Sequence, residues 1–432
     1  MNDLLAVVMA GGMGARLRPL TSVRAKPAVP FGGIYRIIDF TLSNCVNSRI
    51  KQIYVLTQYK SQSLSNHLRH GWNIYSSRLE EFISEIPAQM QHGDQWYDGT
   101  ADAIRQNLHF FRNTRPRLLL ILAGDHIYKM DYRRMRAFHE EKGAVLTIAT
   151  IQMPAAEAAG NYGVLAVDEA YKVMRFEEKP ERPATLPGTE DCLVSMGVYI
   201  FDWRRLLDVL SGYRDFGKEV IPAMVASGEA VYAYDFTRLN CIEELEYRPR
   251  AGYWERELVP RAIDSGYWRD VGTLDAFWQA NLDLVSIAPK FNLYGELWPT
   301  YSYPMHYPPA KFVHESPGRT GVAYNSILAD GVIVSGATIR NSLLGPGTYV
   351  NSYAQIESSY LTGGTLSGGR RLETIIGRNC QIRNAIVDKS VHLSEGTRIG
   401  FDRGEDEARG LTTATIAGSD DYVVCVAKGA AL

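Results

Sequence analysis

Aliphatic residues recur every six positions in the last third of the chain, and this spacing constrains the fold more than any other feature. The residues between them are mostly Gly, Ser, Asn and Thr, and from 327 to 369 only Asp330, Arg340 and Glu357 are charged. Such a hexapeptide repeat predicts a left-handed parallel β-helix, in which each hexad forms one face of a triangular coil and its aliphatic residue points inward. An ordinary β-sandwich is the alternative, but its strands alternate every two residues. The repeating residues are Ile327, Ile333, Ile339, Leu344, Val350, Ile356, Ile376, Ile382, Leu393 and Ile399.

Short apolar runs alternate with amphipathic stretches before this repeat. The expected strands are 4–10, 53–57, 118–123 and 145–151, and the expected helices include 61–69 and 131–142. This alternation predicts an open α/β sheet with mostly parallel strands. Because ligands of such sheets bind beyond the carboxyl ends of the strands, the residues that follow each strand are the candidates for a site.

The composition changes between the two regions. Residues 286–310 contain five of the 19 prolines and four tyrosines, with little periodicity. We interpret them as a linker that is ordered by its aromatic side chains. The expected organisation is a domain of residues 1–285, a linker of 286–310 and a β-helix of 311–432. The repeat is imperfect near 363–371, which predicts an insertion loop there.

Charge and cysteine content exclude several kinds of partner. Lys and Arg number 46 and Asp and Glu 48, so the formal net charge is −2 and no overall field would attract nucleic acid or an acidic membrane. The five cysteines form no CxxC and no cluster with histidine, which is typical of a reducing cytoplasm and argues against a zinc site. No apolar run reaches the ~20 residues of a membrane span, and the first is too short for a signal peptide. We therefore expect a soluble cytoplasmic protein.

A glycine-rich segment follows the first expected strand directly. It contains Gly11, Gly12 and Gly14 and then Arg16, but it has neither the P-loop spacing nor the third glycine of a dinucleotide fingerprint. Glycines at a strand end let backbone N–H groups converge on phosphate oxygens, and an arginine adds a bidentate cation. A glycine-rich turn with a surface arginine is the alternative. Lys26, in a segment stiffened by prolines, supplies a second cation and favours a phosphate site.

These glycines, together with Arg16 and Lys26, resemble the signature of the sugar-1-phosphate nucleotidyltransferase family. Longer stretches are similar to the bacterial glucose-1-phosphate adenylyltransferases of that family, and together they cover nearly the whole chain. These stretches are KPAV from 26, YRIIDF from 35, LSNC from 42, GTADA from 99, AGDHIY from 123, FEEKP from 176, YWRDVGT from 267 and PPAKFV from 308. The resemblance implies a Rossmann-like nucleotidyltransferase domain followed by a left-handed β-helix, which agrees with the pattern described above.

A carboxylate ends the most apolar of the expected strands. By its position alone, Asp125 is either a helix cap or a metal ligand. The family pattern makes it a ligand of Mg²⁺ together with Asp270, and two carboxylates with nucleotide phosphates suit that ion. The sequence offers no cluster of histidine and cysteine for a softer metal.

The resemblance also implies contacts with the sugar and the nucleotide. Lys179 matches the lysine that holds the sugar phosphate, and Glu178 matches its partner for glucose hydroxyls, although Glu-Glu-Lys is also common as a solvated charge run. Asp215 begins a DFG triplet, but the chain has no kinase HRD loop, and the residue matches a substrate-pocket loop of the family. Further substrate contacts are expected at Tyr97, Gly99, Gly163 and Ser195.

The implied reaction converts ATP and α-D-glucose 1-phosphate into ADP-glucose and pyrophosphate for glycogen (α-glucan) synthesis. The attacking phosphate is already anionic, so cations and positioning must provide the catalysis rather than a general base. The expected catalytic residues are Arg16, Lys26, Asp125 and Asp270. UTP or dTTP in place of ATP is one alternative, because the adenine preference rests on the resemblance alone. A non-catalytic regulatory subunit is the other, although such a subunit is expected to lose these charged residues.

The family is allosteric, and the chain departs from its pattern at the effector site. Arg24, Arg36 and Arg383 remain as candidate effector-binding cations. Val23 and Pro30 replace a lysine and a histidine that some members use for fructose 1,6-bisphosphate. Because a lost charge-assisted hydrogen bond weakens anion binding, we expect a weak response to fructose 1,6-bisphosphate and AMP.

A singly phosphorylated or carboxylate metabolite is the expected activator. Compensation by another lysine, such as Lys51 or Lys428, is the alternative. The family resemblance also implies a homotetramer.

Overall fold

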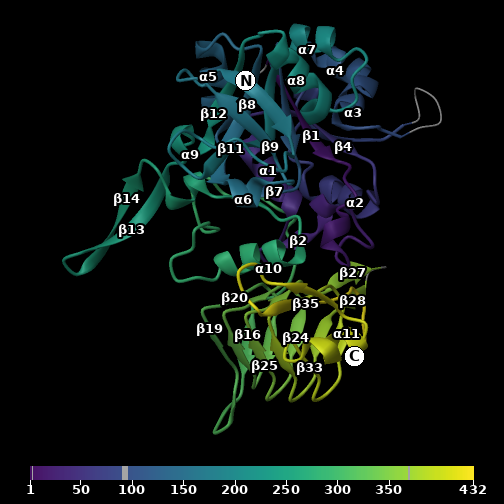
Figure 1. The fold of residues 1–432 in the computed structure, drawn as a ribbon. Helices are drawn as coiled ribbons and strands as arrows, with labels where there is room; N and C mark the ends of the chain where they lie inside the picture. The colour runs from purple at the N-terminus through teal and green to yellow at the C-terminus, as the bar shows by residue number, and fades with distance from the viewer. Residues whose placement is uncertain (2, 90–95, 368–369) are drawn as a thin grey trace.

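The computed structural model describes residues 1–432 except 2, 90–95 and 368–369. Figure 1 shows a part with a central sheet and helices stacked on a coil of short strands, and a long hairpin that projects sideways from the first part. Among the described residues, no helix has the length and apolar character needed to cross a membrane.

The first part is built around a nine-stranded mixed sheet. Its order is β10-β9-β11-β6-β1-β4-β5, and β8 pairs with both β11 and β12. Strands β1, β4, β5 and β6 are parallel, whereas β11 is antiparallel to β6, β8 and β9. The strands are β1 (Leu4–Ala10), β4 (Gln52–Thr57), β5 (Phe82–Pro87), β6 (Leu118–Ala123), β8 (Leu146–Pro154), β9 (Gly163–Val167), β10 (Val173–Glu178), β11 (Asp191–Asp202) and β12 (Val231–Asp235).

Helices cover both faces of this sheet, which explains why its strands are apolar throughout rather than alternating. In β1, Leu4, Ala6 and Val8 face one core, and Leu5 and Val7 face the other. The first core is closed by α1 (Ile37–Asn47), α2 (Gln62–Gly71), α5 (Tyr132–Glu141), α6 (Ala155–Ala158) and α9 (Phe236–Leu239). The second is closed by α3 (Thr100–Gln106), α4 (Leu108–Thr114), α7 (Trp203–Val209) and α8 (Ile221–Ala226).

The second part is a left-handed parallel β-helix, as the six-residue repeat predicts. Its three faces are the sheets β16-β21-β24-β29-β32, β19-β22-β25-β30-β33 and β20-β23-β26-β31-β35-β34. Neighbouring coils pair in parallel, and among the described strands of these three sheets only β34 is antiparallel to its neighbour, β35. The strands are β16 (Lys311–Val313), β19 (Val322–Tyr324), β20 (Ile327–Leu328), β21 (Ile333–Ser335), β22 (Thr338–Arg340), β23 (Leu343–Leu344), β24 (Thr348–Val350), β25 (Gln355–Glu357), β26 (Tyr360–Leu361), β29 (Thr374–Ile376), β30 (Gln381–Arg383), β31 (Ala385–Val387), β32 (His392–Leu393), β33 (Arg398–Ile399), β34 (Thr412–Thr415) and β35 (Tyr422–Val426), with α11 (Arg403–Ala408) after β33.

The repeat predicts which residue of each hexad points into the coil. This prediction is correct for most coils and wrong for the first. Eight of the ten repeating residues are buried in the coil interior, and Ile339, for example, stacks in register on Ile356. Ile333 is only half-buried, and its neighbour Val334 takes the interior position. Ile327 packs instead against the cluster that joins the two parts. The physical reason is the short step of five residues from Val334 to Ile339 around the corner of the coil, which a strict period of six does not capture.

An insertion interrupts the coil where the repeat is imperfect, as expected. Val334 pairs with Val350, 16 positions on, whereas Val350 pairs with Ile376, 26 positions on. The extra residues include β27 (Thr365–Ser367) and β28 (Arg370–Leu372), which pair antiparallel. Residues 368 and 369 of the expected loop lie outside the described residues.

Residues 286–310 contain no helix or strand and run along α1. The indole N–H of Trp298 donates to Asn44 Oδ1 (3.0 Å), and the backbone N–H of Tyr301 donates to Ser43 Oγ (2.8 Å). Phe291 and Trp298 are the two buried residues of this segment, and its other residues are half-buried or exposed.

The β-helix packs against α10 (Leu274–Asp283) of the first part. The rings of Phe277 and Tyr360 lie 5.9 Å apart, and Trp278 Nε1 donates to the Ser358 carbonyl. Val423 and Cys425 of β35 belong to the same buried cluster. A stretch near the C-terminal end of the chain therefore helps to hold the two parts together.

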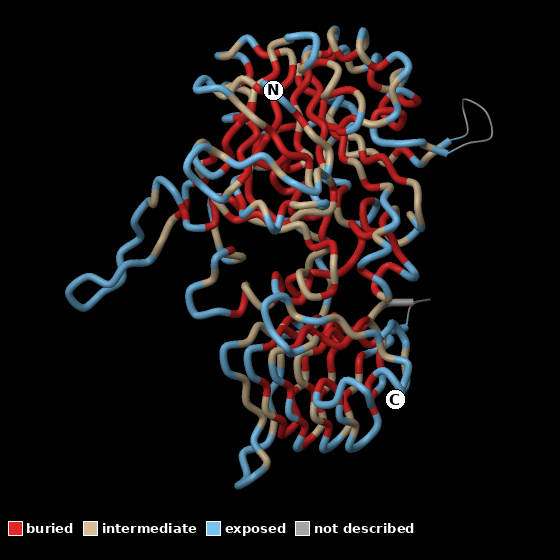
Figure 2. Tube along the Cα trace, viewed as in Figure 1, coloured by how far each residue is buried: buried red, intermediate tan, exposed pale blue. Residues whose placement is uncertain are grey.

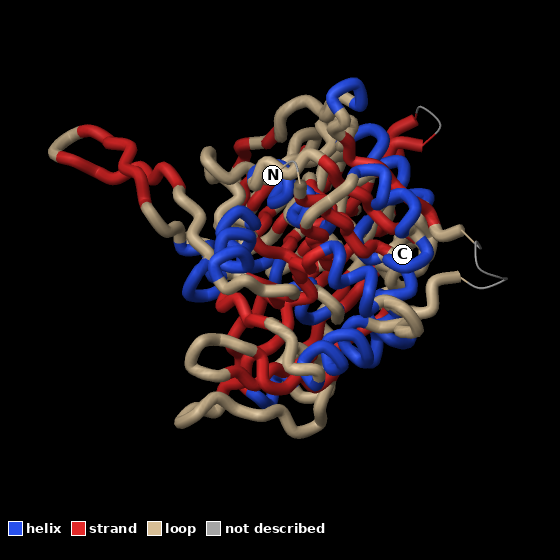
Figure 3. Tube along the Cα trace, turned by 90° about the horizontal axis from the view of Figure 1, so that it is seen from above, coloured by secondary structure: helices blue, strands red, loops and turns tan. Residues whose placement is uncertain are grey.

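The projecting hairpin consists of β13 (Glu244–Arg250) and β14 (Tyr253–Val259). Figures 1 and 3, which are turned by 90° from one another, both show it extending away from the body. The two strands pair only with each other among the described residues.

Candidate functional site

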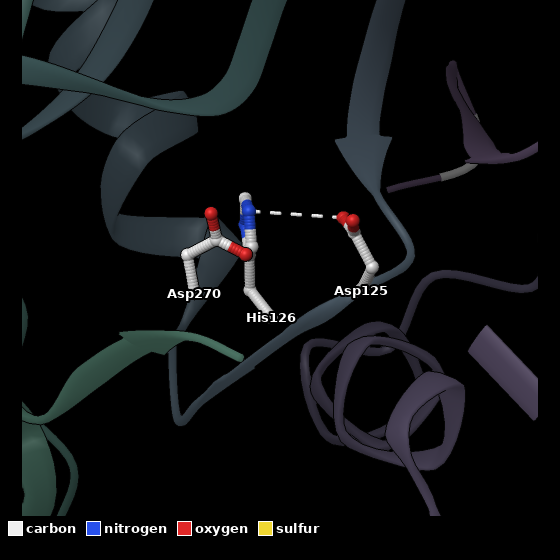
Figure 4. A group of neighbouring side chains, drawn as sticks. All are labelled: Asp125, His126 and Asp270. Atoms are coloured by element: carbon white, nitrogen blue, oxygen red, sulfur yellow. Dashed lines mark ion pairs between the residues drawn. The ribbon is translucent and has the colours of Figure 1, made fainter. Parts of the chain in front are cut away.

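Two carboxylates meet at the carboxyl end of the central strands. Asp125 lies two residues after the end of β6, and Asp270 ends β15 (Trp268–Asp270). That strand pairs antiparallel with β7 (His126–Tyr128), which places Asp270 opposite His126. Ligand atoms of Asp125, His126 and Asp270 lie within 4.8 Å of one another (Figure 4). Residues 145 positions apart in sequence therefore form one acidic cluster, because the short antiparallel pairing of β15 with β7 brings them together.

Lys26 lies between these carboxylates. Its Nζ is 2.9 Å from Asp125 Oδ2 and 2.7 Å from Asp270 Oδ1, and the side chain is almost fully buried. Burial alone would raise the pKa of Asp125, but Lys26 and then His126 outweigh it and lower that pKa to about 2. Burial would likewise lower the pKa of Lys26, but the two carboxylates raise it above its usual value. Asp125 and Lys26 are therefore both charged at neutral pH.

The glycine loop wraps around the same lysine. Gly14 has φ 59°, and a Cβ there would lie 3.0 Å from Cβ of Lys26 and 3.1 Å from Cγ2 of Thr21. The Thr21 hydroxyl donates to the Gly14 carbonyl at 2.8 Å. Gly12 is exposed, with open space where a Cβ would be. The loop needs glycine for its conformation at position 14 and leaves free backbone beside the cations.

Arg16 lies beside the acidic cluster, because a Cβ at Gly272 would be 3.2 Å from a guanidinium nitrogen of Arg16 and 3.3 Å from Asp270 Oδ1. Its guanidinium is exposed and lies near Asn161 Oδ1 (3.4 Å). Arg16, Tyr162 and Asp270 line a cavity of about 740 Å³ that extends to residues 416 and 417 of the β-helix. The structure thus brings together Arg16, Lys26, Asp125 and Asp270.

A second group of expected residues gathers at the ends of β9 and β10. Gly163 pairs with Glu178, and a Cβ at Gly217 would overlap the Glu178 carboxylate. Burial raises the pKa of Glu178, and the nearby Asp215 raises it further, whereas Lys179 lowers it. Lys179 itself has φ 51°.

Asp215 and Gly99 lie next to this group. Asp215 accepts hydrogen bonds from Lys218 N–H (3.0 Å) and from the Thr100 hydroxyl (3.3 Å). A Cβ at Gly99 would overlap the Arg214 carbonyl, and its φ of 115° also demands glycine.

Two further expected residues have internal partners. Ser195 is buried on β11, with its hydroxyl 3.2 Å from that of Tyr199. The Tyr97 hydroxyl accepts a hydrogen bond from Asn107 (2.8 Å), so its polar end is engaged with the segment between α3 and α4.

Residues 161–163 and 197 connect the two groups. The N–H of Lys179 donates to the Tyr162 carbonyl (3.1 Å), and Asn161 contacts Arg16. A Cβ at Gly197 would lie 3.6 Å from His126 Cε1. The sugar-side residues and the acidic cluster therefore line one continuous region at the carboxyl end of the sheet.

A separate group of cations lies between the two parts of the molecule. Arg24 forms a buried bidentate pair with Asp388, both distances being 2.9 Å. Arg36 donates to Ser63 (2.8 Å to the carbonyl) and, with Lys389, lines a small cavity. Burial and then the charges of Arg36 and Arg24 lower the pKa of Lys389 to about 7.

Sequence reasoning missed Lys389 and selected Arg383 instead. Arg383 lies on another face of the coil, where its guanidinium contacts Asp421 (3.3 Å) and Phe401. The structure does not bring it to Arg24 and Arg36. The available signal was the charged pair Asp388–Lys389 directly after the apolar residues of the buried strand β31.

The fold and this site define a nucleotidyltransferase, and the comparisons with known proteins agree. The model of the family described as "Nucleotidyl transferase" matches residues 5–286, and one described as "GlmU-like, C-terminal hexapeptide" matches residues 308–418. The glucose-1-phosphate adenylyltransferase 2 of Pseudoalteromonas atlantica is 44% identical over 95% of this chain and 92% of its own length. The glucose-1-phosphate adenylyltransferase of Nitrosococcus oceani is 43% identical over 95% and 92%, and that of Nitrosomonas europaea 44% over 94% and 89%. The chain belongs to the nucleotidyl transferase family and, within it, to the glucose-1-phosphate adenylyltransferases.

Proposed function

We propose that this protein transfers the adenylyl group of ATP to α-D-glucose 1-phosphate, giving ADP-glucose and pyrophosphate for α-glucan synthesis. A phosphate oxygen of the sugar forms a bond to the α-phosphorus of ATP, and the bond from that phosphorus to the β-phosphate bridge breaks. No proton needs to move in this step. The observation that carries the proposal is the cluster of Lys26, Asp125 and Asp270 beside Arg16 and a glycine loop, in a chain 44% identical to such enzymes over nearly its whole length.

Cations supply the catalysis, because the reaction brings two polyanions together. In our proposal Arg16 and Lys26 bind the departing pyrophosphate, with the backbone N–H groups of residues 11–14 beside them. Lys179 holds the attacking phosphate and Glu178 binds the glucose hydroxyls. The close packing of Glu178 on Gly217 supports this role, since it fixes the position of the carboxylate.

A divalent metal ion fits the acidic cluster. Asp125 and Asp270 offer hard carboxylate oxygens, the donors that Mg²⁺ prefers, and the lowered pKa of Asp125 keeps its carboxyl ionised. Mg²⁺ bound there would supply positive charge to the triphosphate. Lys26 forms an ion pair with each carboxylate and so holds the two close together.

The substrate assignment is tested by measuring pyrophosphate release with ATP, UTP, dTTP and GTP at fixed glucose 1-phosphate. We expect ATP to be preferred. A preference for UTP would overturn the adenylyl assignment and leave the nucleotidyltransferase class intact.

We also propose that anionic effectors bind beside Arg24, Arg36 and Lys389. The buried cations and the small cavity between the two parts of the molecule support this site. Val23 is exposed and provides no charge, and Pro30 lines the cavity, which supports weak binding of a bisphosphate. Titration of each effector at fixed substrates tests this, and strong activation by micromolar fructose 1,6-bisphosphate would contradict it.

The remaining proposals concern organisation. We propose a catalytic domain of residues 1–285, a linker of 286–310 and a β-helix of 311–432, and a cytoplasmic homotetramer. All five cysteines are free, which supports a reducing compartment. Sedimentation of a monomer at micromolar concentration would contradict the tetramer.

A further inference from the structure

The projecting hairpin of β13 and β14 carries large apolar side chains that are exposed to solvent. Tyr247 is 60% exposed, Trp254 67% and Leu258 51%, and Figure 2 shows most of the hairpin as solvent-accessible. An isolated two-stranded hairpin is marginally stable in water, and additional strands are the usual remedy. The exposed apolar residues and the small number of strands indicate that the hairpin pairs with a further strand from a partner.

The base of the hairpin is fixed to the body. Glu244 is buried, and its Oε1 accepts hydrogen bonds from the N–H groups of Leu245 (2.9 Å), Glu296 (2.9 Å) and Leu297 (3.1 Å). Higher up, Arg256 pairs with Glu296. The hairpin therefore leaves the body in a defined direction, as a docking element must.

The two faces of the hairpin differ in character. The register pairs Leu245 with Leu258, Tyr247 with Arg256 and Pro249 with Trp254, so these six residues share one largely apolar face. The guanidinium of Arg256 lies over the Tyr247 ring, 5.6 Å from its centroid. The other face carries the charged residues, whose ion pairs cross between the strands: Arg248–Glu257 at 3.3 Å and Arg250–Glu255 at 3.0 Å.

On the edge of β13 that faces away from β14, one residue has both backbone groups available for pairing with another strand. Pro249 has no N–H, so in the alternating ladder the even-numbered residues hydrogen-bond to β14, and the odd-numbered ones direct their backbone groups outward. Leu245 N–H points outward too, but Glu244 already accepts from it. Tyr247, between them, presents both an N–H and a C=O on the open edge, and among the described residues no strand other than β14 pairs with β13.

Charges of opposite sign flank Tyr247. Glu246 precedes it and Arg248 follows it on the charged face, and the nearest approach of the two is a loose 3.9 Å. When a second β13 strand runs antiparallel to the first with the two Tyr247 residues opposite each other, each Glu246 lies opposite an Arg248. A second copy of the chain is therefore the partner whose charges match it.

We propose that β13 pairs antiparallel with β13 of a second copy, across a two-fold axis at Tyr247. Tyr247 then exchanges two backbone hydrogen bonds with the partner's Tyr247. Glu246 faces the partner's Arg248, and Leu245 faces the partner's Pro249. The two hairpins form a four-stranded sheet with one continuous apolar face and one charged face.

The size of this contact defines its role in the assembly. Stable interfaces bury ~1,200–2,000 Å² in total, and two strand edges of this length bury less than that. The pairing is therefore an added contact between copies that also meet elsewhere. Copies that are already held together gain from it through the high effective concentration of the second hairpin.

A symmetric disulfide tests the geometry. In a Cys241→Ser background, Tyr247→Cys places a thiol opposite its own copy, where the Cα–Cα distance of a hydrogen-bonded pair, ~5.5 Å, suits a disulfide. Mild oxidation should give a covalent dimer on a denaturing non-reducing gel. Tyr253→Cys is the matched control, because Tyr253 is 63% exposed on the same hairpin but lies on β14. Equal dimer yields from the two variants would overturn the proposal.

A charge exchange then tests the pairing partner. In the Tyr247→Cys background, Glu246→Arg or Arg248→Glu alone should reduce the disulfide yield several-fold, because like charges then face each other. The double variant Glu246→Arg/Arg248→Glu restores opposite charges across the two-fold axis and should recover the yield. Position 246 also lies opposite Glu257 of its own hairpin, so the same exchanges are repeated in a Glu257→Gln background, which removes that internal partner and leaves only the contact between copies. Lack of recovery would overturn the proposal.

Discussion

At the scale of single residues, Asp125 carries the most direct test of the candidate site. Asp125→Ala removes one of two carboxylates that hold Lys26 and fit a metal ion. We expect turnover to fall by about 10²–10³-fold, the usual effect of removing one electrostatic group from a catalytic site. Pyrophosphate release measures the loss, and thermal unfolding shows whether the fold survives.

Asp168→Ala is a suitable comparison for Asp125→Ala. Asp168 caps the turn between β9 and β10, where it accepts from the N–H groups of Ala170 and Lys172 (both 2.9 Å). Its loss should leave turnover near the wild-type value. A near-normal rate for Asp125→Ala would remove that residue from the catalytic assignment.

His139 predicts a pH dependence of stability that is independent of the active site. It is buried in α5 with Nδ1 2.8 Å from the Thr147 hydroxyl, and burial lowers its pKa to about 4. The unfolded chain takes up this proton near pH 6.5, so stability is complete above that value and is lost as the pH falls toward 4. The shift corresponds to roughly 3 kcal/mol.

Urea unfolding at several pH values between 7 and 4 checks this prediction. The variant His139→Leu should be less dependent on pH in this interval than the wild type, whatever its absolute stability. His109→Leu, at an exposed position on α4, should retain the wild-type slope. An unchanged slope in His139→Leu would show that other groups control acid sensitivity.

Lys389 predicts that anion binding between the two parts depends on pH. Because its pKa is lowered to about 7, the ammonium is mostly charged at pH 6 and mostly neutral at pH 8. Sulfate keeps the same charge over this range, so it should bind more tightly at pH 6. Sulfate-dependent thermal shifts measure this, and Lys389→Met should abolish the difference. An equal difference in the variant would assign it to other groups.

At the scale of elements, the interior of the coil can be probed with matched substitutions. Ile382 is fully buried and stacks between Ile356 and Ile399, whereas Ile333 is half-buried. Ile382→Ala should cost about 2–5 kcal/mol of stability, as for other buried aliphatic deletions, and Ile333→Ala clearly less. Urea unfolding of the full chain compares them. Equal losses would contradict the observed phase of the repeat.

The sequence predicted the elements whose pattern is local. A six-residue spacing requires a coil, and apolar strands followed by glycines and carboxylates require an α/β sheet with its site at one edge. The inward position of Val334 in place of Ile333 was not predictable, because it depends on where each corner turns. The contacts of Lys26 with Asp125 and Asp270 were not predictable either, since they join positions 99 and 244 residues apart.

The same limit applies to Lys389 and to the hairpin. Lys389 becomes part of a cation group only because the coil docks against α1 and its neighbours. The alternation of apolar and charged residues in β13 and β14 is typical of a strand pair. The direction in which this hairpin projects from the body follows from contacts with residues 296 and 297 at its base.

At the scale of the whole molecule, the pair Arg24–Asp388 links the two parts through a buried contact. Both side chains are almost fully buried and their hydrogen bonds are bidentate. Asp388→Leu leaves Arg24 buried without its partner and should cost about 3–5 kcal/mol. The double variant Arg24→Leu/Asp388→Leu should recover much of this loss, which the shift of the urea midpoint measures. If the double variant is as unstable as the sum of the single ones, the two residues do not act as a pair.

The position of β35 has a consequence for how the protein is made. This strand lies between β31 and β34 and contributes Val423 and Cys425 to the cluster with Phe277 and Trp278 of α10. A nascent chain that has not yet passed residue 426 lacks this strand, so the apolar strip of α10 and β31 stays uncovered however well the sheet domain has folded. Translation products that end before β35 would consequently expose a hydrophobic surface of the kind that chaperones and proteases recognise, and only a chain that includes this strand can hide it.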